Sequence, residues 1–269
     1  MKKKDLISTY ALLALFIGGV QAQTSIILSP EIGIHSSKLK PTGDLDLSDN
    51  YQGMDINYSG IFSYQGGIGV GIQFFGNWGL ITGVKYNRKG GKVTVETRNP
   101  INPFQINTDP ENPTFDLGEF TTTIQYNCLS IPILARGQFG GAFKVGLAIG
   151  PQINMGIGKY KETIEYNLEN TSLSTDETTH ESGKSSTNMF KKSHMSLLVL
   201  PYVAYDLSDN GSFKLSMMIE AGGNMVNDNL VVVDNYNNLR NVNGTMRNTQ
   251  MGIMLSYEHR FDLKTGVKY

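Results

Sequence analysis

The sequence GIGVGIQF at residues 67–74 alternates small or polar residues with large apolar ones. Successive side chains of a β-strand point to opposite faces, so the apolar residues of this stretch would share one face. These residues are Ile68, Val70, Ile72 and Phe74. The stretch therefore predicts a strand with one apolar face and one narrow, glycine-rich face.

Period-two alternation recurs on both sides of this stretch. Gly76-Asn77 is a two-residue hairpin signal, and a second alternating segment begins at Trp78. Counted along the whole chain, such segments predict about eight strands. They lie at residues 25–36, 60–75, 78–95, 119–136, 143–150, 192–206, 213–221 and 251–261.

The connections between these segments alternate in length. Short turns are predicted at residues 76–77, 137–141 and 208–211. Long polar loops are predicted at residues 38–59, 98–118, 162–189 and 227–244. The run 171–187 is rich in Ser, Thr and Glu, and its composition predicts disorder. Alternating short and long connections are typical of a sheet whose two ends face different compartments.

These features predict an all-β fold: an eight-stranded antiparallel up-and-down transmembrane β-barrel with short periplasmic turns and four long external loops. Each apolar band has the roughly 9 to 11 residues that cross a bilayer obliquely. Aromatic residues occur near the band ends, as expected at membrane interfaces. They are Trp78, Tyr86, Phe143, Tyr202, Tyr205, Tyr257 and Phe261.

A soluble periplasmic β-protein, such as a lipocalin-like barrel or a sandwich, is the competing fold. It would turn the apolar face inward, and alternation alone does not distinguish the two arrangements. Two observations favour the membrane: strand charges lie opposite the apolar bands, and the polar face is rich in glycine.

The N-terminus has the layout of a secretory signal peptide. Three lysines, Lys2 to Lys4, precede a short apolar run, and Ala22 offers a small residue for cleavage. The predicted organisation is a cleaved signal peptide at 1–22, a barrel domain at 23–262 and a short tail at 263–269. An outer-membrane location in a Gram-negative bacterium follows as an expectation.

Composition excludes several classes of function. A net charge of −1 gives no general attraction to nucleic acid. The single cysteine, Cys128, excludes an internal disulfide framework and leaves a thiolate metal site without partners. Asp44 to Asn50 only partly resembles a calcium loop, because the turn glycine and distal glutamate are missing. We expect no cofactor and no metal.

Charged residues on the polar face form a candidate lumen network. An eight-stranded barrel is just wide enough for side chains to fill it, and buried charges must pair or stay hydrated. The mixed signs favour an ion-pair plug over a small conducting pore. The network comprises Glu31, Lys85, Arg136, Lys144, Lys214, Glu220, Glu258 and Arg260.

The last alternating segment resembles the C-terminal assembly signal of outer-membrane proteins. Its residues QMGIMLSY at 250–257 place a polar residue, a glycine, an apolar residue and an aromatic at the signal's spacing. These are Gln250, Gly252, Leu255 and Tyr257. The resemblance implies recognition by the barrel-assembly machinery, although a tail from Asp262 to Tyr269 follows the usual terminal aromatic.

Nearly all of the mature chain resembles the PorT-like family of outer-membrane β-barrels, common in Bacteroidetes. The resemblance rests on PEIG at 30–33, the glycine-rich 67–71, CLSIPIL at 128–134 and GLAIGP at 146–151. It implies an eight-stranded outer-membrane barrel. The family's named member is linked to type nine protein secretion.

We expect a non-enzymatic barrel with a structural, binding or secretion-accessory role. A small solute pore and a membrane-embedded hydrolase or acyltransferase are the alternatives. The hydrolase or acyltransferase would use His35 or His194, but nothing in the sequence places a nucleophile beside either histidine. Expected partners are outer-membrane lipid, the assembly machinery, and proteins or ligands at the external loops. We expect a monomer that binds no nucleic acid.

Overall fold

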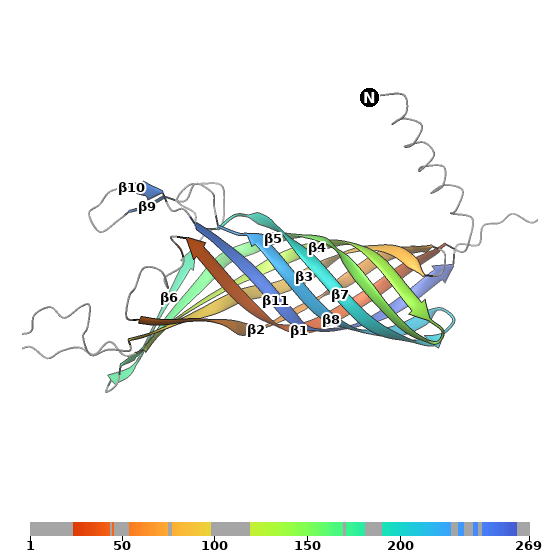
Figure 1. Ribbon diagram of the computed structural model, residues 1–269, viewed down its shortest axis with the longest axis horizontal. Helices are drawn as coiled ribbons and strands as arrows, with labels where there is room; N and C mark the ends of the chain where they lie inside the picture. Colours follow the sequence, from red (N-terminus) through yellow and green to blue (C-terminus); the bar gives the residue numbers. More distant parts are fainter. Residues whose placement is uncertain are drawn as a thin grey trace, which may run out of the picture.

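Eight long antiparallel strands form a closed ring in the computed structural model (Figure 1). They are β1 (Ser25–Gly43), β2 (Met54–Phe74), β3 (Trp78–Thr97), β4 (Glu119–Gly140), β5 (Phe143–Leu168), β7 (Ser193–Ser208), β8 (Gly211–Asn224) and β11 (Gly244–Asp262). Each strand pairs with the next in this order, and β1 closes the ring against β11. The all-β, eight-stranded barrel fold is thus confirmed.

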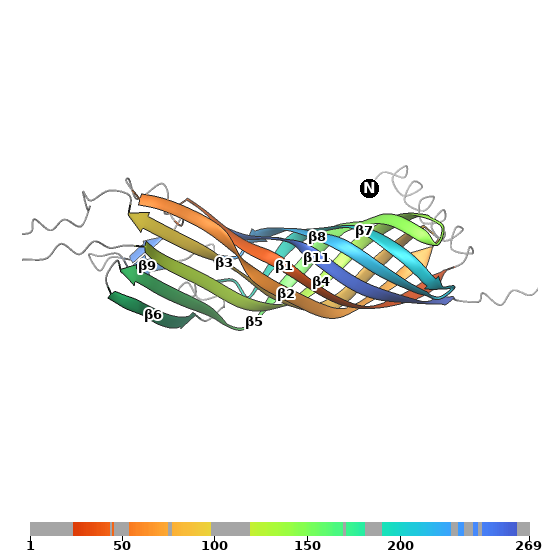
Figure 2. The same ribbon diagram turned by 90° about the horizontal axis from the view of Figure 1, so that it is seen from below.

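Three shorter strands lie outside the ring. β6 (Thr171–His180) pairs with β5, and β9 (Val231–Val233) pairs with β10 (Leu239–Asn241). Figures 1 and 2 place all three at the end of the barrel opposite the short turns. We call this end external and the short-turn end periplasmic.

The structure describes most of the chain between residues 24 and 262. The described residues are 24–43, 45, 54–74, 77–97, 119–168, 171–180, 190–226, 231–233, 239–241 and 244–262. Within these ranges, no helix is long and apolar enough to span a bilayer. Four predicted segments lie wholly or mostly outside the described residues. They are the signal peptide at 1–22, the calcium-loop-like stretch Asp44 to Asn50, the loop at 98–118 and the tail at 263–269.

A band of exposed apolar side chains surrounds the periplasmic half of the barrel, and we call it the belt. The central belt residue Ile32 is 65% exposed, and its neighbours along β1 alternate between exposed and buried. Belt residues on other strands include Ile68, Leu80, Ile133, Leu147, Leu197, Leu215 and Ile253. A continuous exposed apolar surface of this kind matches the outward face of a barrel in lipid.

The strands run past the belt on the external side, and we call this part the extension. It includes residues 37–43 of β1, 54–61 of β2 and 88–97 of β3. β1 continues to Gly43 and β2 begins at Met54, so both ends of the loop predicted at 38–59 are strand instead. β3 runs to Thr97, close to the end of the strand predicted at 78–95. Residues 162–168 and 171–180 are also in strand, so the prediction of a loop and of disorder there was wrong for these residues. Their Thr-rich and Glu-rich composition is compatible with strands because β4 and β6 supply backbone partners to the end of β5, and β5 supplies them to β6.

Candidate functional site

The lumen of the belt contains a buried ion-pair cluster near its periplasmic end. Arg136 of β4 donates from one guanidinium nitrogen to both carboxylate oxygens of Glu258 on β11, at 2.9 and 2.8 Å. Lys214 of β8 donates to the same carboxylate at 2.6 Å. All three side chains are almost fully buried. The Glu258 carboxylate therefore links β11 to β4 and β8 across the interior. Burying this charge is favourable only because two cations are held within hydrogen-bond distance of it.

A second cluster lies at the periplasmic mouth. Asp206 of β7 accepts from Lys144 of β5 and from Arg260 of β11. These side chains are 12 to 23% exposed, so solvent reaches them. Water at the mouth screens this cluster more strongly than the Glu258 cluster behind it.

Glycine on the polar face makes room for a third pair. Lys85 of β3 pairs with Glu31 of β1, and both are buried. A Cβ at Gly67 would overlap the backbone of Val84 and Lys85. The glycine-rich face of β2 therefore lets neighbouring strands and long charged side chains occupy a narrow lumen.

An apolar layer packs against the ion pairs and continues on their external side. Its buried members are Ile81, Leu134, Ala148, Leu198, Leu200, Tyr202, Ala204, Met218 and Met254. Tyr202 was predicted at the membrane interface, but its ring lies in the lumen and its hydroxyl accepts from Arg136 Nε at 2.9 Å. The prediction was wrong because β7 is apolar on both faces, so its sequence does not show which face points inward.

Beyond the apolar layer, a polar network surrounds Glu220 of β8. Its carboxylate pairs with Lys89 of β3 and accepts from the Gln152 amide at 3.0 Å and the Asn154 amide at 3.3 Å. Asn154 also donates to Ser196 Oγ at 2.9 Å. Glu220 and Lys89 are fully buried, and the surrounding amides satisfy the carboxylate on several sides.

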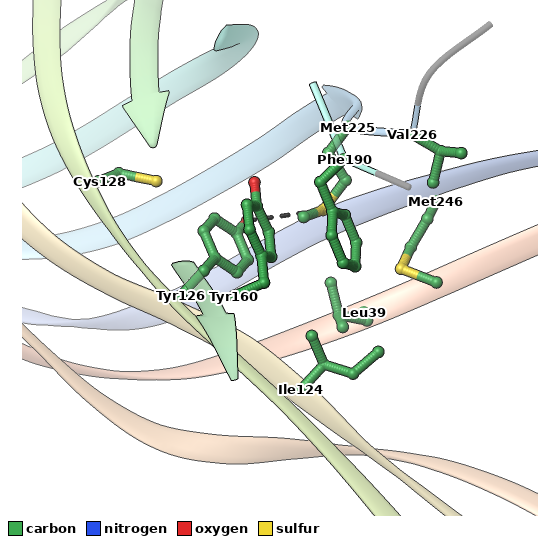
Figure 3. Close-up of a cluster of buried hydrophobic side chains, with 9 residues drawn as sticks. All are labelled: Leu39, Ile124, Tyr126, Cys128, Tyr160, Phe190, Met225, Val226 and Met246. Carbon is green, nitrogen blue, oxygen red and sulfur yellow. Dashed lines mark hydrogen bonds between the residues drawn. The ribbon is translucent and has the colours of Figure 1, made fainter. Parts of the chain in front are cut away.

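An aromatic and methionine cluster fills the lumen of the extension (Figure 3). The ring of Tyr160 stacks between Tyr126 at 4.6 Å and Phe190 at 3.9 Å. The Tyr126 hydroxyl donates to the Met225 sulfur at 3.6 Å. Burial raises the pKa of the Tyr160 hydroxyl. We call this cluster the cap: Leu39, Ile124, Tyr126, Cys128, Tyr160, Phe190, Met225, Val226 and Met246.

The order of layers along each strand shows how the lumen is closed. Along β11, Arg260, Glu258, Met254 and Met246 belong in turn to the mouth, the buried cluster, the apolar layer and the cap. A water-filled channel would expose these lumen side chains to solvent. Instead, Leu134, Met218 and Met254 are each about 1% exposed. Side chains therefore fill the described interior.

The two histidines considered as candidates for catalysis, His35 and His194, are buried in the lumen. His35 Nε2 lies 3.1 Å from the carbonyl oxygen of Arg88, and the His194 ring contacts the edge of Tyr126. Among the described residues, no group of three or more His, Cys, Asp or Glu side chains is placed to hold a metal ion.

The four residues of the predicted assembly signal lie on β11. Gln250 is buried in the lumen, where it accepts from Asn87 at 3.2 Å, and Leu255 is exposed in the belt. Tyr257 packs edge-on against Phe213 at 5.5 Å. A Cβ at Gly252 would overlap the backbone of Ile34 and the side chain of His35. Close approach of β1 to β11 thus gives this glycine a packing role.

Sequence reasoning missed Lys89, Asp206 and the apolar lumen layers. Lys89 lies within the predicted strand 78–95 and continues the alternation of Lys85 and Asn87 by one more step, so following the polar face along that strand would have found it. Met218 likewise lies between Ser216 and Glu220 on the inward face. Asp206 lies at a strand end, and only the ring arrangement brings it beside Arg260.

Comparisons with known proteins agree with this geometry. Residues 21–269 match the family model described as outer membrane protein beta-barrel domain. No curated protein matches the chain in sequence.

Three solved outer-membrane proteins are similar to this chain at low sequence identity. Neisserial surface protein A is 11% identical to this chain, with a TM-score of 0.35. The alignment covers 88% of this chain and 97% of the neisserial chain. OprG from Pseudomonas aeruginosa is 12% identical with a TM-score of 0.38, covering 91% and 99%. The outer membrane protease OmpT from Escherichia coli is 10% identical with a TM-score of 0.44, covering 88% and 97%. Identities of this size carry no information about activity.

Proposed function

The chain belongs to the outer membrane protein beta-barrel domain family, and we propose that it is a non-enzymatic barrel with a closed lumen. Its role is to hold a rigid external surface in the outer membrane. The observation that carries the proposal is the filled interior: buried ion pairs, an apolar layer and the aromatic cap follow one another along the barrel.

The filled interior argues against both alternatives. A solute pore needs a continuous hydrated path, whereas Met218 and Met254 lie side by side in the lumen and both accept from the Gln65 amide. A hydrolase needs a nucleophile and a base that a substrate can reach. His35 and His194 are buried, where His35 lies against a backbone carbonyl oxygen and His194 against the Tyr126 ring.

Binding specificity would reside at the external end, since loops on a rigid scaffold commonly carry recognition. We propose that the barrel is a PorT-like, secretion-accessory or adhesive protein, exported with a cleaved signal peptide and inserted by the barrel-assembly machinery through the 250–257 signal. We further propose that it is a monomer and that its partners contact the external loops.

Planar-bilayer recording tests the closed lumen. Purified protein should give no steady channels at any moderate voltage. The double variant Met218→Ala and Met254→Ala, which thins the apolar layer, should show more frequent brief openings than the wild type. Steady wild-type conductance would overturn the closed-barrel proposal and favour the pore.

Activity assays on detergent-purified protein test the non-enzymatic role. We expect no cleavage of peptide or phospholipid substrates above a heat-denatured control. Turnover that disappears in His194→Ala and His35→Ala variants would instead favour the membrane-embedded hydrolase. Pull-down from solubilised membranes would then identify partners of the external end.

A further inference from the structure

Cationic side chains gather on the outer wall of the barrel immediately external to the belt. The strand segments there are 36–43, 57–64, 86–94, 121–127, 155–161, 190–195, 222–226 and 245–250. Their exposed or partly exposed cations are Lys38, Lys40, Arg88, Lys92, Lys159, Lys161, Lys191, Lys192 and Arg247. The same segments contain no Asp or Glu.

This charge distribution differs from the two neighbouring zones. In the belt, the described charged residues point into the lumen, as Glu31 and Lys85 do. At the periplasmic mouth, the acid Asp206 pairs with both Lys144 and Arg260, so charges of both signs are present. On the outer wall, the eight segments defined above carry cations alone, and acids reappear only farther from the belt, at Asp55, Glu96, Glu162 and Glu165. A one-sign patch at a membrane edge attracts the opposite charge of lipid headgroups.

Within this cationic zone the wall is hollowed at one place. A groove of about 200 Å³ lies across β2, β3, β4 and β5. Its lining residues are Tyr64, Tyr86, Arg88, Gln125, Tyr126, Asn127, Lys159 and Lys161, with three cations and no acid. The groove lies at the belt edge, since the exposed belt residues Ile68 and Val84 follow Tyr64 and Tyr86 toward the periplasm.

A bulge in β5 helps to form the groove. Asn127 of β4 pairs with Ile157, whereas Gln125 pairs with Lys161, so β5 has extra residues at this point. Gly158 adopts a φ of 75°, which glycine tolerates without strain. Bulges bend a strand and redirect its side chains. Here Tyr160 enters the cap while Lys159 and Lys161 line the groove.

The groove also holds its arginine in place before any ligand binds. The Arg88 guanidinium donates to the Gln125 side-chain oxygen and lies 6.0 Å from the centre of the Tyr64 ring. Tyr64 in turn stacks on Tyr86 at 6.0 Å. A guanidinium offers five N–H donors, so several remain for a ligand after the Gln125 bond. An ordered guanidinium matches the oxygens of a phosphate.

We propose that this groove binds the phosphate of an anionic lipid headgroup in the outer leaflet. Arg88 would contact the phosphate directly, and Lys159 and Lys161 would add positive charge from β5. Tyr64 and Tyr86 would lie at the level of the headgroup, where amphipathic rings are favoured. The lipid's acyl chains would run along the exposed belt residues of β2 and β3. This site is independent of the closed lumen proposed above.

Lipid A binding to purified protein in detergent micelles tests the proposal. Arg88→Gln, Lys159→Gln and Lys161→Gln together form the groove variant. Lys38→Gln, Lys40→Gln and Arg247→Gln form the matched control, which removes the same charge from the opposite wall of the same zone. Native mass spectrometry and displacement of fluorescent lipid A measure affinity, and heat-modifiable gel mobility verifies folding of each variant.

We expect the groove variant to bind bisphosphorylated lipid A at least about 30-fold more weakly than wild type, and the control within about threefold. Dephosphorylated lipid A should bind all three proteins equally weakly. Equal losses in both variants would overturn the groove, because the effect would then be diffuse attraction by the whole zone. Full displacement by millimolar inorganic phosphate would overturn the lipid assignment and indicate a free-phosphate site.

Discussion

The belt and the extension are built from the same strands with opposite orientations of apolar residues. In the belt, Ile32 and Ile68 face outward while Glu258 and Arg136 are buried inside. In the extension, Tyr160 and Phe190 are buried inside while Asn57 and Lys161 are exposed. Solvent explains the change: lipid surrounds the belt, and water surrounds the extension. The external part is therefore organised like a soluble β-protein placed on a membrane barrel.

Removing the central acid of the belt should have the largest effect. Glu258→Ala leaves Arg136 and Lys214 as buried cations without their shared partner, which should lower the free energy of unfolding by about 3–5 kcal/mol. Urea titration in detergent, followed by heat-modifiable gel mobility, measures the loss. Asp206→Ala at the hydrated mouth is the control and should cost about 1 kcal/mol or less. Equal losses would mean that the Glu258 cluster is also hydrated.

Removing the cap aromatic should affect the extension selectively. Phe190→Ala deletes a fully buried ring that stacks on Tyr160, with an expected local cost of about 3–5 kcal/mol. Limited proteolysis should then cleave the extension faster, while the belt strands remain protected in the detergent micelle. Simultaneous loss of belt protection would contradict the separation of the two regions.

Placing a charge on the outer face should distinguish lipid from water on one strand. Ile68→Arg in the belt should cost about 2–4 kcal/mol, because a charge near the bilayer centre is poorly solvated. Asn57→Arg, on the extension part of β2, should change stability by about 0.5 kcal/mol or less. Refolding into lipid vesicles measures both. A similar cost at the two positions would place the membrane boundary higher on β2 than we infer.

The smallest expected effect concerns the Tyr126 hydroxyl. Tyr126→Phe removes its hydrogen bond to the Met225 sulfur but keeps the ring stacked on Tyr160, so we expect a cost of about 1 kcal/mol or less. Comparing its proteolysis rate with that of Phe190→Ala separates the contribution of the hydroxyl from that of aromatic packing. A loss as large as that of Phe190→Ala would show that the hydroxyl is a main support of the cap.

Period-two alternation was sufficient to predict the ring of strands. The strand of residues 67–74 and its neighbours indicated eight strands, and the connection lengths indicated their up-and-down order. Strand ends were predicted less well. Residues 171–180 lack an apolar face, and residues 162–168 carry only a short one, Ile164, Tyr166 and Leu168. Above the bilayer a strand needs only backbone partners and a covered inner side, so composition did not identify these segments as strands.

The candidate groove could not be predicted from the sequence. Tyr64, Arg88, Gln125 and Lys161 lie on four different strands, and their approach depends on the register between those strands and on the bulge at Gly158. Lumen pairs show the same limit. Glu31 and Lys85 could both be assigned to the polar face. Their contact, however, requires that β2, the strand between them, has glycines rather than larger side chains on its inward face.

By itself, the sequence determined which residues share a face of a strand, because alternation is a local property of the backbone. It also determined the barrel's two-sided plan through the lengths of its connections. Only the tertiary structure decided which charges meet, where apolar layers close the lumen and where the outer wall is hollowed. These features depend on the register of eight strands in a ring, which brings together residues far apart in the chain.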